Sequence, residues 1–251
     1  MEWQEPAVVL AARPHGDAAA VVTLLTEAQG RHTGFAHGGA SRAQSALWQR
    51  GNLVEARWVA RAADQLGSLT GELVHPAAAL AMDDPLALAL LSAACTVADG
   101  ALPEREPHPR TFHGLVSLIA RLTGAAAPLL PDYVRWEAEM LAELGYGLDL
   151  SRCAATGATE DLVWVSPRTG HAASAAAGEP WRDRLLPLPA FLLGQGGAMG
   201  PAGPEEWLAG LRLTGHFLAR DAFGLQHKPL PAPREMLQDR VALLASPAPT
   251  G

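Results

Sequence analysis

A single cysteine and the residues after it look like the first half of a zinc site. In the stretch RCAATG, Cys153 is followed three residues later by Thr156 and then by Gly157. A zinc knuckle needs a second cysteine where Thr156 stands and another pair about twenty residues later, because structural Zn²⁺ takes about four ligands. Residues Asp161 to Trp181 contain no cysteine. One thiolate cannot hold a structural zinc ion, so the sequence predicts no bound metal.

The motifs of common enzyme classes are absent from the sequence. It has no Walker loop, no H-E-x-x-H pair and no G-x-S-x-G elbow. The glycine-rich run LLGQGGAMG, with Gly194, Gly196, Gly197 and Gly200, misses the dinucleotide-binding pattern by one position and follows a helix-like run. That run therefore indicates a plain loop. Because nothing completes a set of nucleophile, base and orienting group, we expect no catalytic residue and no cofactor.

The basic residues of the first part of the chain gather in one window. The formal net charge of −7 argues mildly against nucleic-acid binding by the molecule as a whole. Between Gly30 and Ala63, however, five arginines outnumber the single acid Glu55, which gives a local charge of +4. The five are Arg31, Arg42, Arg50, Arg57 and Arg61. This window is either a nucleic-acid-binding groove or an ordinary solvated face.

Aromatic residues accompany these arginines. Proteins that bind single strands combine a cationic groove with aromatic rings on which bases stack, and Phe35 and Trp48 lie inside the window. Trp58 alternates in phase with Val54, which predicts a core position for Trp58 and places Arg57 on the opposite face. Trp48 stands in a polar loop, where burial and exposure are equally compatible with the sequence.

The first part of the chain reads as short strands with turn signals between them. Hydrophobic runs and one clear alternation are bounded by segments such as Arg13 to Asp17 and Gly38-Gly39. The five expected strands are Ala7–Ala12, Ala18–Glu27, Arg31–His37, Asn52–Arg61 and Leu66–Val74. Five short strands of this kind predict a small closed barrel, with Ala40 to Arg50 as a basic connecting loop or short helix.

The rest of the chain has helical periodicity. Asp83-Asp84-Pro85 is a helix start signal, and Phe112 to Leu122 repeats apolar residues on one face. Pro131 to Leu144 predicts an amphipathic helix that ends at Gly145, and Pro204 to Phe223 predicts the last strong helix. In the helix at Pro131 we expect Tyr133, Trp136, Met140 and Leu144 to point inward and Arg135, Glu137, Glu139 and Glu143 outward.

An irregular lobe interrupts the helical part at about 150–182. In it, Leu162 to Val165 and His171 to Ser174 read as a β-hairpin, and Leu188 to Leu193 opens a further helix. The sequence thus predicts an α+β protein with two domains: a five-stranded barrel at 1–78, and an α-helical domain at 79–251 with a zinc-knuckle-like lobe that lacks the metal ligands.

Nothing in the sequence predicts a membrane or export signal. The first residues carry early acids and no long apolar core, and the longest apolar run, Pro85 to Val97, is too short to span a bilayer. The two cysteines, Cys95 and Cys153, form no disulfide framework. We expect a soluble protein of the cytoplasm.

Three segments resemble, in the right order, the bacterial RecO family of DNA-repair proteins. The first is FAHGGASRAQSALWQRGNLVE, which ends at Glu55 and resembles the family's basic connection between two strands. The second, YVRWEAEMLAELGYGLDLSRCAATG from Tyr133 to Gly157, resembles its helix followed by the knuckle. The third, LRLTGHFLARDAFGLQHKPLPAPREM from Leu211 to Met236, resembles its C-terminal helix and the arm that follows.

The resemblance implies an OB-fold barrel and a mediator of recombination in the RecF pathway. It implies binding to single- and double-stranded DNA, strand annealing, and loading of RecA onto DNA coated by single-strand binding protein (SSB). The implied partners are RecR, the acidic tail of SSB, RecF and RecA, and the implied place is the nucleoid. Some family members carry a four-cysteine zinc site where this chain keeps only Cys153, so the departure puts the metal in doubt.

Candidate site residues follow from the basic window and the resemblance together. For DNA we expect Arg31, His37, Ser41, Arg42, Arg50, Arg57 and Arg61. For the carboxylates of an SSB tail we expect Arg121 and Arg212 on the helices. Two other functions stay open: a protein-only adaptor that binds partner chains through barrel and helices, and a metal-independent hydrolase with a dispersed site.

Overall fold

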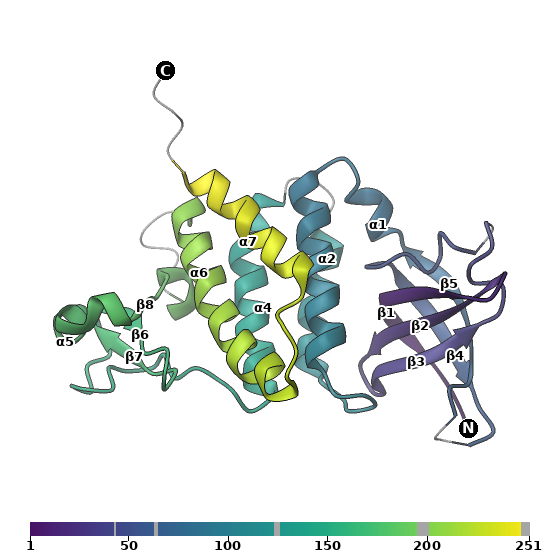
Figure 1. Ribbon diagram of the computed structural model, residues 1–251, viewed down its shortest axis with the longest axis horizontal. Coiled ribbons are helices and arrows are strands. Elements are labelled where there is room, and N and C mark those ends of the chain that lie inside the picture. Colours follow the sequence, from purple (N-terminus) through teal and green to yellow (C-terminus); the bar gives the residue numbers. More distant parts are fainter. Residues whose placement is uncertain (43, 63–64, 123–125, 195–200, 247–251) are drawn as a thin grey trace. The chain divides into compact units, whose positions relative to one another are not determined.

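The computed structural model describes residues 1–42, 44–62, 65–122, 126–194 and 201–246, which form two compact units, Met1–Leu129 and Leu130–Gly251. The first unit holds a barrel of strands and several helices, and the second is mostly helical (Figure 1). This confirms the expected α+β class. Three glycines of the glycine-rich run, Gly196, Gly197 and Gly200, lie outside the described residues.

The barrel is closed by five strands, as the sequence predicts. The strands are β1 (Glu2–His15), β2 (Ala19–Thr26), β3 (Gly30–Ala36), β4 (Leu53–Val59) and β5 (Ser68–His75). Their order is β1-β2-β3-β5-β4, and β4 pairs with β1 to close the barrel (Figure 1). The β3–β5 pair is parallel and the others are antiparallel. This order and closure are those of an OB-fold.

The first strand is longer than the sequence indicates. Its opening residues alternate between exposed and partly buried and contain no hydrophobic run, so local pattern does not mark them as a strand. They are held by β4, since Glu2 to Val8 pair with Val59 to Leu53 in antiparallel register. Pairing with a distant strand therefore decides where β1 begins.

Both tryptophans of the basic window pack in the barrel core. Trp58 is 3% exposed, as predicted, and its indole N–H donates to the carbonyl of Leu66 over 2.8 Å. Trp48 is 2% exposed and belongs to the same core cluster, which decides the question that the sequence left open. Gly67 turns beside the Trp58 indole at φ +68°, where a Cβ atom would overlap the ring. Neither tryptophan is available as an exposed stacking surface.

Helices complete the first unit. Asp84 caps the start of the predicted apolar helix: one carboxylate oxygen accepts from the Leu86 N–H over 2.8 Å, and the other accepts from the Ala126 N–H over 3.0 Å. Phe112, Leu115 and Ile119 of the next helix are buried, as their spacing indicates. The elements are α1 (Ala77–Leu80), α2 (Pro85–Ala101), α3 (Pro109–Arg121) and the 3-10 helix η1 (Ala127–Leu129).

The second unit packs α4 (Leu130–Glu143), α6 (Pro204–Phe217) and α7 (Ala232–Ala245) side by side (Figure 1). Its three-stranded sheet has the order β7-β6-β8 and contains the predicted hairpin. The sheet and its attached helices are β6 (Leu162–Val165), β7 (Ala172–Ser174), α5 (Ala175–Gly178), η2 (Glu179–Arg184), β8 (Leu186–Pro187) and η3 (Ala190–Leu193). After α6 come η4 (Leu218–Phe223), a π-helix, and η5 (Gly224–Gln226).

Two expectations for the second unit are wrong. The residues after Phe223 do not end as an arm, because α7 forms a further helix whose buried residues are Arg234, Leu237 and Val241. Glu137, expected to point outward, is fully buried and bonded to Arg234. A helical face that holds one carboxylate can turn inward when a distant helix brings a guanidinium, which no local pattern reveals.

Candidate nucleic-acid interface

An aromatic residue lies on the outer face of β1, β2 and β3. The strand register places Arg13 of β1 beside Val21 of β2, and Val21 beside Phe35 of β3. Phe35 is only partly buried, between His15 at a ring-centroid distance of 5.5 Å and His37 at 4.7 Å. Both histidines stand edge-on to the phenyl ring and are exposed. We call Phe35, His15 and His37 the Phe35 platform.

The connection from β3 to β4 lies at the same end of the barrel as this platform. The N–H of Ala40 donates to the carbonyl of Ala18 in the β1–β2 turn over 2.9 Å. The carbonyl of Ser41 accepts from the N–H groups of Gln44 and Ser45, which fixes the turn that carries the exposed Arg42. Arg42 therefore adds a cation close to the β1–β2 turn and the platform.

Two of the expected DNA contacts hold the barrel to α2 instead. The Arg31 guanidinium donates to the carbonyl of Leu102 over 2.8 Å and lies 3.6 Å from Asp99. The Arg50 guanidinium donates to the carbonyl of Leu10 over 3.0 Å and to the Ser92 hydroxyl over 3.3 Å. Side chains committed to such bonds are poor phosphate ligands, because they would first have to break them.

The remaining expected arginines lie on another part of the barrel. Arg57 points outward from β4, which stands between β1 and β5 and does not pair with β3. Its guanidinium Nε is 2.6 Å from a Glu2 carboxylate oxygen, and this hydrogen bond lowers the pKa of Glu2 and raises the pKa of Arg57. Arg61 is exposed just after β4. The structure thus brings together His37, Ser41 and Arg42, and separates them from Arg57.

Sequence reasoning missed Arg13 and His15. Both were taken only as part of a turn signal, Arg13 to Asp17, and Asp17 is the acid of that turn. A signal was present, since Arg13 and His15 alternate along an extended strand end and so share one face. What the sequence could not show is that this face is continuous with Phe35 across β2.

The lobe around Cys153 is closed by protein hydrogen bonds. The Cys153 N–H donates to the carbonyl of Ala158 over 2.7 Å, and the Ser174 hydroxyl lies 3.6 Å from its sulfur. Hydrogen bonds from Thr156, and then from Ser174, lower the pKa of the Cys153 thiol to about 6. Within the described ranges, no three histidine, cysteine or acidic residues gather as a metal site would require.

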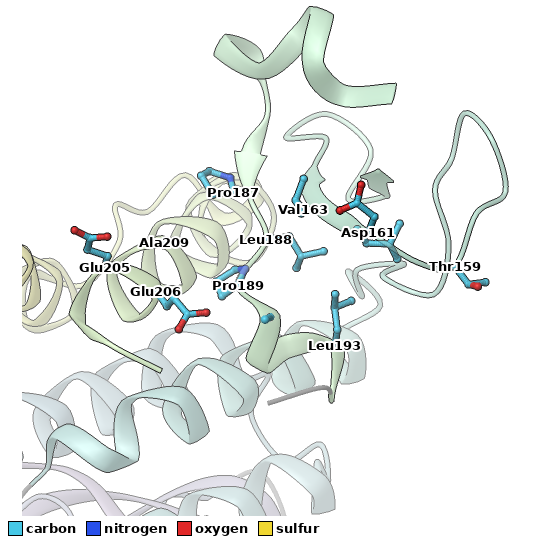
Figure 2. A pocket seen from close by; sticks show the side chains of 12 residues that line it. Thr159, Asp161, Val163, Pro187, Leu188, Pro189, Leu193, Glu205, Glu206 and Ala209 are labelled. Carbon is cyan, nitrogen blue, oxygen red and sulfur yellow. The ribbon is translucent and has the colours of Figure 1, made fainter. Parts of the chain in front are cut away.

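The second unit contains a groove of about 550 Å³ between the lobe and α6. Figure 2 shows its apolar floor, with Leu188 and Leu193, and carboxylates from Asp161, Glu205 and Glu206 around it. Negative charge at the rim opposes an acidic peptide in this groove. The two arginines expected to meet such a peptide, Arg121 on α3 and Arg212 on α6, are both exposed and do not line it.

Comparison with known proteins decides which family shares this architecture. Residues 1–77 match the family model "Recombination protein O N terminal", and residues 82–231 match "Recombination protein O C terminal". The chain belongs to the RecO family. The resemblance seen in the sequence is thereby confirmed, and with it the OB-fold of the barrel.

Full-length relatives of the RecO family support the same assignment. The chain is 57% identical to the DNA repair protein RecO of Granulibacter bethesdensis, with 97% of each chain covered. It is 51% identical to that of Rhodospirillum centenum, covering 96% of this chain and 94% of the relative. For Caulobacter vibrioides NA1000 the identity is 49%, with 96% and 98% covered. No helix within the described ranges is long and apolar enough to cross a membrane.

Proposed function

We propose that this protein is a recombination mediator without catalytic activity. It binds single- and double-stranded DNA, anneals complementary strands and, with RecR, helps to load RecA onto DNA coated by SSB in the nucleoid. RecF is a further partner in this proposal. The observation that carries the DNA-binding part is the Phe35 platform, which lies on an OB-fold face together with exposed cations.

The platform has the chemistry that single-strand binding needs. In OB-folds the face of strands 2 and 3 and the adjoining loops bind oligonucleotides. Phe35 offers a ring on which a base can stack, and its edges are already occupied by His15 and His37. Arg13 and Arg42 are exposed near the same end of the barrel and can neutralise phosphates.

The negative charge of the whole chain does not oppose this assignment. Charges separated by more than about 8 Å are largely screened at physiological salt. The potential that a strand meets at the platform is therefore set by Arg13, Arg42 and the single turn acid Asp17, more than by the acidic remainder of the chain. Contacts of this kind do not distinguish sequences, and annealing of any complementary pair requires that property.

The protein partners rest on family membership and on two exposed arginines. Arg121 and Arg212 remain our candidates for the carboxylates of an SSB tail. They belong to different compact units, so each is to be tested separately. Binding of a fluorescent tail peptide at low salt should saturate, and Arg121→Ala or Arg212→Ala should weaken it. Unaltered binding by both variants would contradict the assignment of these residues.

The DNA-binding proposal is tested by annealing and by titration of single strands. Phe35→Ala should weaken single-strand binding roughly 5- to 100-fold, the range expected when one stacked base loses its partner. Trp181→Ala removes an exposed aromatic of the second unit and should leave binding unchanged. A wild-type protein that neither binds single strands in a salt-dependent manner nor anneals them would refute the proposal and favour the protein-only adaptor.

A further inference from the structure

A second aromatic site opens at another part of the barrel surface, near the start of β1. Its cavity is about 350 Å³, within the range of roughly 300–1,000 Å³ that is common for pockets of small ligands. The wall is built by strands β1, β3 and β4 and by the segment that joins α2 to α3. The residues that matter below are Trp3, His32, Trp58, Glu2 and Arg105. We call this cavity the Trp3 pocket.

Three rings form its walls. Trp3 and Trp58 lie nearly parallel, with an interplanar angle of 14° and 6.1 Å between ring centroids. His32 stands edge-on to both, with centroids 5.2 Å from Trp3 and 4.7 Å from Trp58. Trp58 is fixed by its hydrogen bond to Leu66, and Trp3 is only partly buried. The more exposed Trp3 is therefore the ring that can meet a ligand face to face.

The pocket contains buried polar atoms that lack protein partners. His32 is only 4% exposed, and neither ring nitrogen has a hydrogen-bond partner among the described residues. The indole nitrogen of Trp3 is buried and likewise without a partner there. Buried polar groups in folded proteins nearly always have partners, so these atoms mark a place where a ligand can supply them.

Burial keeps the His32 ring neutral at physiological pH. Desolvation, with a smaller contribution from Arg105, lowers the pKa of His32 to about 4, whereas Glu104 and Glu5 act in the opposite direction. A neutral imidazole donates from one nitrogen and accepts at the other. The pocket therefore presents two N–H donors, one from His32 and one from Trp3, together with one acceptor, beside aromatic faces.

We propose that the Trp3 pocket binds a nucleobase of single-stranded DNA. This inference rests on the proposed function. A base is planar, stacks on indole and carries both donors and acceptors on its edge, so it complements rings and neutral histidine alike. An aliphatic side chain would leave these polar atoms without partners, and a cation would meet Arg105, while the Glu2 carboxylate already pairs with Arg57. Arg105 and Arg57 supply positive charge near the bound strand.

The inference is tested with the full-length protein and two oligonucleotides of equal length. One is oligo(dT), and the other has the same sugar-phosphate chain with abasic sites. Trp3→Leu should weaken binding of oligo(dT) roughly 5- to 100-fold and leave binding of the abasic chain unchanged. Trp3→Phe should retain most of the affinity, because a phenyl ring still stacks. Trp181→Leu, the same change at an exposed tryptophan of the second unit, should have no effect.

A base analogue locates the contact. 2-Aminopurine within oligo(dT) should change fluorescence on binding to the wild type, and the change should shrink with Trp3→Leu. Thymidine monophosphate alone shows whether a free nucleotide also enters: it would then quench tryptophan emission in the wild type but not in Trp3→Leu. Thermal unfolding of each variant shows that Trp3→Leu is folded.

Two results overturn the inference and leave the proposed function standing. In one, Trp3→Leu binds both oligonucleotides as the wild type does, while Phe35→Ala weakens binding of oligo(dT). In the other, Trp3→Leu loses both oligonucleotides equally, so that the pocket contributes no contact to a base. If the wild type binds no single strand at all, the proposed function itself fails.

Discussion

The guanidinium Nε of Arg234 lies 2.5 Å from a carboxylate oxygen of Glu137, and both side chains are fully buried. The two residues are 97 positions apart, on α7 and α4. The same carboxylate accepts from the hydroxyls of Tyr133, over 2.6 Å, and Thr214, over 2.5 Å, so three helices meet at one charge. Every strong donor around Glu137 thus helps to offset the cost of burying it.

Removal of Arg234 should destabilise the protein strongly. Arg234→Met leaves the buried Glu137 without its cation, which costs about 3–5 kcal/mol in the free energy of unfolding. Adding Glu137→Gln should restore part of that loss, because a neutral amide still accepts from Tyr133 and Thr214. Denaturant titration measures both effects. Arg182→Met breaks an exposed pair with Glu179 and should change stability by less than about 1 kcal/mol. Equal costs at the two sites would contradict this account of the buried pair.

Alanine at Gly67 should disturb the barrel core. Gly67 has φ +68°, and an added Cβ would overlap the Trp58 ring, so we expect a loss of about 2–4 kcal/mol from strain and displaced packing together. Gly16 is a matched control: it has φ +63° with no atom near the added Cβ, and Gly16→Ala should cost only about 1 kcal/mol. Thermal melts compare them. Similar melting temperatures for the two variants would show that the Trp58 contact is unimportant.

The neutral state of His32 should make stability depend on pH. The unfolded chain takes up a proton at this residue near pH 6.5, whereas the folded protein does so only near pH 4. Because the unfolded state binds more protons in that window, the contribution of His32 is present above pH 6.5 and is lost as pH falls toward 4. Denaturant titrations at several pH values should show a shallower decline for His32→Leu than for the wild type. Parallel declines would contradict the burial of a neutral ring.

The salt dependence of DNA binding should identify the arginines that touch phosphate. Arg13→Ala and Arg42→Ala should each flatten the slope of log affinity against log salt by about 0.7 for a single strand. Arg50→Ala should lower stability by about 1 kcal/mol and leave the slope unchanged, because Arg50 bonds Leu10 and Ser92. A slope that responds to Arg50 and not to Arg42 would reverse our assignment.

The lobe at Cys153 should fold without stoichiometric zinc. The missing ligands follow from the sequence, and hydrogen bonds to Ala158 and Ser174 close the lobe. Elemental analysis of the purified protein should find far less than one zinc per chain, and Cys153→Ser should cost only about 1 kcal/mol. One tightly held zinc ion per chain would show that ligands were overlooked.

The sequence by itself determined the elements whose signals are local. Alternation marked β4 and placed Trp58 inside, acids before Pro85 marked the start of α2, and two short apolar runs around a turn marked the hairpin of β6 and β7. These signals suffice because strand and helix periods act over neighbouring residues. Three longer motifs also carried the RecO resemblance, which the family models confirm.

Only the tertiary structure decided which side chains meet. Glu137 turns inward because α7 brings Arg234 to it, and Arg31 is removed from the basic window because α2 offers it Asp99 and Leu102. The face that carries Phe35 becomes a candidate interface because β2 joins it to the end of β1. In each case a charge or ring is directed by a partner far away in the chain, and neither period nor composition encodes the distance between them.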